Sequence, residues 1–161
     1  ARWVRSWVLG FLGLLCAQIT YGAFVSGMKA GYGYNTFPMM GDEWKPEALF
    51  GLTPYWKNFF EDKFSVQFIH RWMGTALTVG LLLLGWRAFK SGVLSKIQKD
   101  RMKWVLGLVG FQFLLGVSTI LLILEYQVSL PVIHQLVALF LFAALLGLVH
   151  SLSGKPDRES A

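Results

Sequence analysis

Four apolar stretches in this chain are each long enough to cross a lipid bilayer. They cover about residues 7–28, 65–89, 104–124 and 131–152. A helix of about 20 apolar residues spans the hydrocarbon core, and it satisfies its own backbone hydrogen bonds there. No polar segment is long enough to form a separate soluble domain. We therefore expect residues 1–161 to form a single all-α transmembrane domain, an up-down-up-down bundle of four helices with one long loop over about 29–64.

The composition and the charge pattern support a membrane protein and indicate its orientation. The chain is 55% hydrophobic with a mean hydropathy of +0.51, and its net charge is +6. The basic residues gather at the helix ends that share one side of the predicted bundle: Arg2, Arg5, Arg87, Lys90, Lys96, Lys99, Arg101, Lys103, Lys155 and Arg158. By the positive-inside rule, both termini are cytoplasmic and the long loop is outside. These residues do not form one basic surface, so we expect no nucleic-acid partner.

Two histidines lie near the outer ends of two of these stretches. His70 is about five residues into the second stretch and His134 is about four residues into the fourth. A helix rises 1.5 Å per residue, which places them roughly 7 Å and 5 Å below their helix starts. A neutral imidazole in a membrane is costly unless something binds it. The pair predicts one shared ligand, a heme iron held from both faces, with a hydrogen-bonded structural role as the alternative for each histidine.

The neighbours of the two histidines suit a porphyrin. Gly74 and Ala138 follow one helical turn below them, and small side chains there leave room for a flat macrocycle. Arg71 is the candidate for a heme propionate, with Lys63 as a second cation. Gln67 is expected to orient an imidazole or to donate to a propionate. The alternative for Arg71 is that its side chain reaches the lipid headgroups.

Other residues give local expectations. Gln18 is expected to form interhelical hydrogen bonds, and Cys16, the single cysteine, to be a small core residue. Ser65 is a candidate helix cap, and residues 54–60 suit a short amphipathic helix at the interface. His150 lies near the far end of the fourth stretch and is expected to be an interfacial residue rather than a ligand. Residue matching shows no internal repeat, although each predicted hairpin has one histidine on its second helix.

Four segments together resemble the heme A synthase family of cytochrome oxidase assembly proteins. They are QITYGAFVSG at 18–27, YNTFPMM at 34–40, VQFIHR at 66–71 and LPVIHQ at 130–135. The resemblance runs through all four stretches. It is to the C-terminal half of a family that has eight helices in two similar halves.

This resemblance implies a heme b cofactor between His70 and His134, with the loop over 35–40 covering its outer edge. In the family, the N-terminal half holds heme O as substrate and a catalytic glutamate on its first helix. The two halves oxidise a methyl group of heme O to the formyl group of heme A. The resemblance also implies a bacterial cytoplasmic membrane, or an equivalent inner membrane, as the location. The implied partners are lipid, an N-terminal half, partner subunit or second copy, and heme O synthase or cytochrome oxidase.

The sequence departs from the family pattern in two ways. Its first stretch has no acidic residue to match the glutamate, and its outer loop has no cysteine pair. The chain begins with Ala1, close to a membrane stretch, as expected of a fragment, a processed piece or one subunit of a split enzyme. No catalytic residue is assigned, and catalysis is expected to need the missing half.

Three functions therefore stand as hypotheses. The first is the heme b-binding half of a heme A synthase-like oxidoreductase, which relays electrons. The second is a free-standing membrane b-type cytochrome, since an iron with two axial histidines transfers electrons without binding substrate. The third is a non-catalytic oxidase assembly factor with structural histidines.

Overall fold

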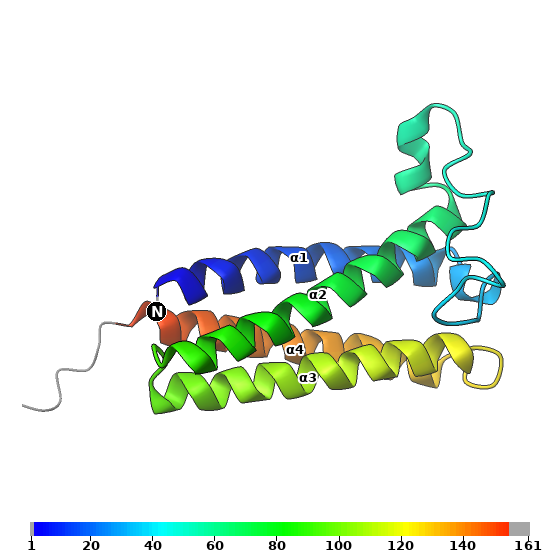
Figure 1. Ribbon diagram of the computed structural model, residues 1–161. Coiled ribbons are helices and arrows are strands. Elements are labelled where there is room, and N and C mark those ends of the chain that lie inside the picture. Colours follow the sequence, from blue (N-terminus) through cyan, green and yellow to red (C-terminus); the bar gives the residue numbers. More distant parts are fainter. Residues whose placement is uncertain (1, 155–161) are drawn as a thin grey trace, which may run out of the picture.

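A computed structural model describes residues 2–154 and shows a bundle of four long helices (Figure 1). They are α1 (Arg2–Gly27), α2 (Lys63–Ser91), α3 (Lys96–Leu121) and α4 (Ser129–Ser153), with two short 3₁₀ helices, η1 (Ala30–Tyr32) and η2 (Tyr55–Phe59). All four long helices are long and apolar enough to cross a membrane. Each packs against its neighbours in the order α1, α2, α3, α4 and back to α1. The predicted all-α, up-down-up-down membrane bundle is confirmed.

Helix α3 begins at Lys96, well before the predicted position 104. The prediction missed this start because the first two turns of the helix are polar. Ser95 caps it: the Ser95 hydroxyl accepts from the Gln98 backbone N–H, while the Gln98 side chain accepts from the Ser95 N–H. This reciprocal cap stabilises a helix start that a search for apolar residues does not detect. Just before it, Gly92 ends α2 in the left-handed conformation (φ 67°), which glycine adopts without strain. The short link keeps α2 and α3 adjacent.

Helix α2 also begins earlier than expected, and the predicted cap Ser65 is wrong. The cap is Asp62, whose carboxylate accepts from the Phe64 backbone N–H. Because the helix starts at Lys63, Ser65 lies inside its first turn. There its hydroxyl donates to Asp62 and accepts from the backbone N–H of Phe50 at 2.8 Å. Ser65 therefore connects the helix start to the outer loop.

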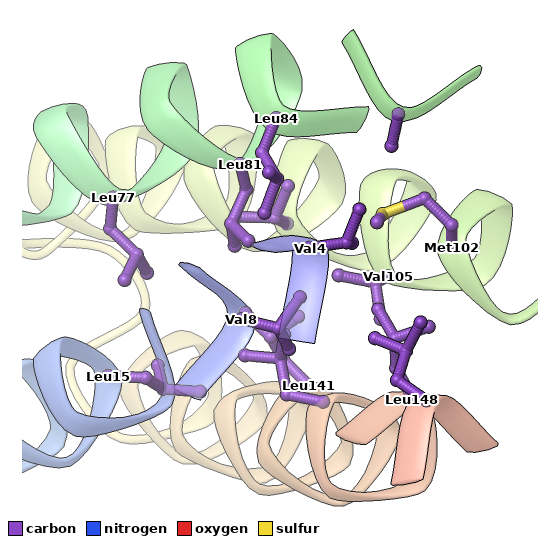
Figure 2. Close-up of a cluster of buried hydrophobic side chains, with 14 of the residues drawn as sticks. Val4, Val8, Leu15, Leu77, Leu81, Leu84, Met102, Val105, Leu141 and Leu148 are labelled. Carbon is purple, nitrogen blue, oxygen red and sulfur yellow. The ribbon is translucent and has the colours of Figure 1, made fainter. Parts of the chain in front are cut away.

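Buried aliphatic side chains fill the half of the bundle that holds the chain termini and the α2–α3 turn, here called the packed half (Figure 2). The residues are Val4, Val8, Leu15, Leu77, Leu81, Leu84, Ala88, Leu94, Met102, Val105, Val109, Leu141, Leu145, Leu148 and Leu152. Cys16 follows Leu15 but is exposed on the bundle surface, so its predicted place in the core is wrong. One residue of rotation along a helix is enough to turn a side chain from the interior to the lipid-facing side.

Toward the other end of the bundle, the burial pattern changes. No residue is fully buried over 16–27 of α1, 68–76 of α2, 110–121 of α3 or 129–140 of α4. We call these four stretches the histidine layer. In Figure 1, α2 diverges from α3 toward this end. The fully buried aliphatic residues of the bundle are therefore concentrated in the packed half.

The outer loop over residues 28–62 is ordered by its own hydrogen bonds. Asn58 of η2 is fully buried, and its side-chain amide donates to the carbonyls of Leu52 and Tyr55. The short helix predicted over 54–60 is confirmed, in the 3₁₀ form. A Cβ on Gly33 would overlap Phe64 Cε1, so a larger residue there would require the Phe64 ring to move.

Exposed aromatic residues accompany the basic residues at the packed end. They are Trp3, Trp7, Trp86 and Trp104. Tryptophan is enriched where a membrane meets water, so their positions suit an interfacial belt. Lys155 and Arg158, which the orientation prediction also used, lie outside the described residues. The orientation itself stays a prediction.

Candidate cofactor site

His70 of α2 packs against two residues of α1. A Cβ built on Gly22 would lie 3.2 Å from His70 Cε1, so the imidazole rests directly on the glycine backbone. One turn earlier, Gln18 Nε2 donates to the His70 carbonyl at 3.0 Å and lies 3.4 Å from His70 Nε2. The expectation that Gln18 bonds between helices is confirmed. Helix α1 thus supplies both the glycine that the ring packs against and the amide that donates to the histidine carbonyl.

His134 of α4 has the same environment, built by α3. A Cβ on Gly116 would lie 2.9 Å from His134 Cε1. Gln112 Nε2 donates to the His134 carbonyl at 3.0 Å and lies 3.5 Å from His134 Nε2. The two hairpins therefore present their histidines in nearly identical ways.

This duplication is an internal repeat that residue matching did not find. Gln18 and Gly22 on α1 correspond to Gln112 and Gly116 on α3, in each case a glutamine followed four residues later by a glycine. Spacing of four places both on one helix face, toward the partner helix of the hairpin. The sequence analysis did not single out Gln112. The signal that could have found it is the shared spacing on the first helix of each hairpin.

The two histidines lie at similar distances from the starts of their helices. His70 is the eighth residue of α2 and His134 is the sixth residue of α4. The helix rise places them roughly 10 Å and 8 Å along their helices. Both are deeper than expected because both helices begin two residues earlier than predicted, and the small offset between the two histidines is unchanged.

The small residues below the histidines are arranged differently from the prediction. A Cβ on Gly74 would lie 2.8 Å from Gln18 Nε2, so the space beside Gly74 is occupied by the Gln18 amide. Gly74 thereby allows Gln18 to reach the His70 carbonyl. Ala138, its counterpart in the prediction, is half-buried. Lys63 is exposed, and its ammonium lies 4.9 Å from the centre of the Phe64 ring.

Arg71 and Gln67 hold the outer loop. Arg71 Nη2 donates to the Tyr34 carbonyl and Nη1 to the Thr36 carbonyl, both at 2.6 Å. Gln67 is fully buried and its Nε2 donates to the same Tyr34 carbonyl at 2.8 Å. The guanidinium of Arg71, which is partly exposed, therefore points toward the backbone of the loop. It anchors the loop across the outer ends of α2 and α3, where Phe37 contacts Phe113 with ring centres 6.0 Å apart.

Several buried polar atoms of this region have no hydrogen-bond partner within residues 2–154. They are His70 Nδ1, His134 Nδ1, Gln18 Oε1, Gln112 Oε1, Gln67 Oε1 and Arg71 Nε. Buried polar atoms in folded proteins are usually paired, and an unpaired one costs about 1–3 kcal/mol. All six belong to the two histidines or to residues around them. His150, by contrast, is exposed on the last turns of α4.

These residues fit a heme held by two histidines. Such a group needs two imidazole donors, apolar surroundings and partners for its carboxylates. The layer offers two equivalent histidines, helix segments with no fully buried residue and a guanidinium with an unpaired N–H.

Comparison with known proteins places the chain in a family. Residues 1–146 match the COX15-CtaA family model, which describes a cytochrome oxidase assembly protein. The chain is 37% identical over 139 residues to a heme A synthase of Rhizorhabdus wittichii, covering 86% of this chain and 38% of that protein.

Other organisms contain similar proteins. The chain is 39% identical over 132 residues to a heme A synthase of Wolbachia sp. subsp. Brugia malayi (81% of this chain, 36% of that protein). It is 38% identical over 131 residues to the heme A synthase COX15 of Arabidopsis thaliana (81% and 28%). The chain spans less than two fifths of the length of these three relatives. No solved structure matches it. Since the family match runs from the start of α1 into α4, the chain belongs to the COX15-CtaA family of cytochrome oxidase assembly proteins.

Proposed function

We propose that this chain is the heme b-binding half of a heme A synthase-like membrane oxidoreductase. The observation that carries the proposal is the repeated histidine–glycine–glutamine arrangement inside the histidine layer. His70 and His134 are the residues that would hold the heme iron. The names of the relatives support the reaction class, and the length that the chain shares with them supports its being one part of such an enzyme.

The chain's own residues have distinct roles in this proposal. A heme bound by two histidines supplies one-electron transfer, with no coordination position left for a substrate. His70 and His134 bind it, while Gly22 and Gly116 let their rings approach the neighbouring helices. The loop held by Arg71 excludes water at the outer end, and the unpaired Arg71 Nε is the proposed donor to a propionate.

The proposed partner is the half that holds heme O. Helix α1 has no acidic residue, so this chain offers no equivalent of the family's glutamate. Oxidising a methyl group to a formyl group releases electrons, and we infer that this half carries them away from the substrate. In this arrangement both termini are cytoplasmic and the outer loop faces the opposite side of the membrane.

The test is a reduced-minus-oxidised absorbance spectrum of the purified chain. We expect a low-spin b-type signal in the wild type that is lost, or converted to high spin, in His70→Ala and in His134→Ala. His150→Ala is the matched control, because it removes an exposed histidine from the same helix as His134. A wild type without a Soret band would contradict heme binding and favour the assembly-factor function.

A second experiment separates an oxidoreductase half from a free-standing cytochrome. The chain is co-expressed with the N-terminal half of a relative and a heme O source, and hemes are extracted and separated. Heme A that depends on both halves supports the proposal. Heme b alone, with no heme A from any combination, favours the free-standing cytochrome.

A further inference from the structure

The hydrogen bonds of the two glutamines fix how their amides are turned. Gln18 Nε2 lies 3.0 Å from the His70 carbonyl oxygen, and Gln112 Nε2 lies 3.0 Å from the His134 carbonyl oxygen. Exchanging the nitrogen and oxygen of either amide would place two acceptors against each other. The NH₂ group therefore faces the histidine in both hairpins.

That NH₂ group also lies beside one nitrogen of each ring. It is 3.4 Å from Nε2 of His70 and 3.5 Å from Nε2 of His134. A ring nitrogen that faces a donor is favoured as an acceptor, which places the single proton of the neutral imidazole on Nδ1. The other neutral tautomer would set a ring N–H against an amide N–H. Nδ1 itself has no partner within residues 2–154 in either ring, so only the glutamine contact distinguishes the two tautomers.

We propose that Gln18 and Gln112 are positioning residues that hold His70 and His134 in the Nδ1–H tautomer, which leaves the Nε2 lone pair as the atom that binds iron. The statement about iron rests on the proposed function, whereas the statement about the tautomer does not. The contact with Nε2 is long and gives way to a stronger ligand. The bond to the carbonyl is of normal length, so it continues to fix the histidine backbone.

The glycines make this arrangement possible. Because Gly22 and Gly116 have no Cβ, each ring lies close enough to its neighbouring helix for the glutamine one turn away to reach the ring and the carbonyl together. Gly74 provides the matching space for the amide of Gln18, as its Cβ position lies 2.8 Å from Gln18 Nε2. Both hairpins have the same glutamine, glycine and histidine contacts. A chance contact in one hairpin would not explain this repetition.

The tautomers are measured in the heme-free chain by ¹⁵N NMR of labelled histidine in detergent micelles. We expect the Nδ1–H form at His70 and His134 in the wild type. Gln18→Leu should give a mixture of tautomers at His70 only, and Gln112→Leu a mixture at His134 only. Gln135→Leu is the matched control, because Gln135 is next to His134 in the chain but is exposed. Helical circular dichroism equal to that of the wild type shows that each variant is folded.

A second measurement uses the heme-loaded chain. Each leucine variant should bind heme about 10-fold more weakly, the usual lower limit when a group that orients a metal ligand is removed. The low-spin ferric EPR signal of each variant should shift its g values, because the histidine backbone from which the imidazole projects is no longer fixed by the glutamine. Gln135→Leu should match the wild type in both respects. A purely structural glutamine would lower stability without moving the EPR signal.

The outcomes separate the two proposals. An Nε2–H tautomer in the wild type, or tautomers and EPR signals that the leucine variants leave unchanged, would overturn the role of the glutamines while leaving heme binding intact. A wild type that binds no heme would overturn the proposed function. The NMR result would still decide whether Gln18 and Gln112 set the tautomers.

Discussion

The packed half and the histidine layer belong to the same four helices but are filled in different ways. In the packed half, aliphatic side chains from all four helices and the α2–α3 turn are buried against one another. In the histidine layer no residue is fully buried. The residues that meet between helices there are glutamine, histidine and glycine. The difference separates aliphatic helix packing at one end of the bundle from the proposed cofactor site at the other.

Membrane physics explains why the two tasks are separated. In lipid, helices associate through close packing and hydrogen bonds rather than through the hydrophobic effect. The packed half supplies that contact. The histidine layer instead holds five unpaired buried polar atoms, each of which opposes stability until a partner is present. The packed half therefore offsets an energetic cost that arises at the other end of the bundle.

The largest expected effect tests whether the packed half carries the stability. Leu145 is fully buried and Leu146 is 44% exposed. Leu145→Ala should lower the free energy of unfolding by about 3 kcal/mol, through lost contacts and the cavity left behind. Leu146→Ala, the control, should change it by less than about 0.5 kcal/mol. The measurement is unfolding in mixed micelles, and equal effects at both positions would remove the distinction between the two halves.

Next in size is the loop over the histidine layer. Arg71→Met removes the charged hydrogen bonds to the carbonyls of Tyr34 and Thr36, which we expect to cost about 2 kcal/mol of local stability. Amide hydrogen exchange over 34–40 should become faster, while exchange in the packed half stays the same. Arg87→Met is the control, because Arg87 is exposed on the same helix. Unchanged exchange over 34–40 would show that the loop is held by other contacts.

A smaller effect tests whether the histidine layer acts on the cofactor rather than on stability. Gly116→Ala places a Cβ 2.9 Å from His134 Cε1, whereas Gly110→Ala meets nothing within 4 Å. We expect Gly116→Ala to weaken heme binding about 10-fold, as for other disturbances of a group that orients a metal ligand. Gly110→Ala should leave it unchanged. Heme titration of the two heme-free variants makes the comparison, and equal affinities would place the His134 ring elsewhere when heme is bound.

The smallest effect concerns the polar start of α3. Ser95→Ala removes the cap and should cost about 1 kcal/mol without altering the heme spectrum. Ser118→Ala is the control, since that hydroxyl only donates to the Leu114 carbonyl of its own helix. The measurement is the thermal unfolding temperature of each variant, which should fall for Ser95→Ala more than for Ser118→Ala. A change in the heme spectrum of Ser95→Ala would mean that the two ends of the bundle are coupled.

Particular residues show how far the sequence alone could go. The apolar stretches predicted four helices because hydropathy follows directly from composition, and Gln18 was correctly expected to bond between helices. The polar start of α3 was missed because hydropathy does not report a capping box. Cys16 was misplaced because a helix that is apolar on every side gives no sign of which side faces its neighbours.

For the candidate site, the sequence could indicate the histidines but not their surroundings. The cost of an imidazole in lipid is a property of the residue and its depth, so His70 and His134 stand out in the sequence itself. Gln112 is marked in the sequence only by the glutamine–glycine spacing that it shares with Gln18, and its role depends on which helix packs beside α4. Arg71 similarly acquires loop carbonyls as partners only once the chain between η1 and α2 has folded back over the helix ends.

The sequence by itself determined that this protein is a four-helix membrane bundle with two histidines near one end, because helix length, apolarity and the cost of buried polar groups are local properties of the chain. Only the tertiary structure decided that each histidine rests on a glycine and receives a glutamine amide from the preceding helix of its hairpin. The hydrogen bonds from the glutamines join residues 22 and 52 positions apart. They depend on the rotation of each helix about its axis, which packing fixes and hydropathy leaves open.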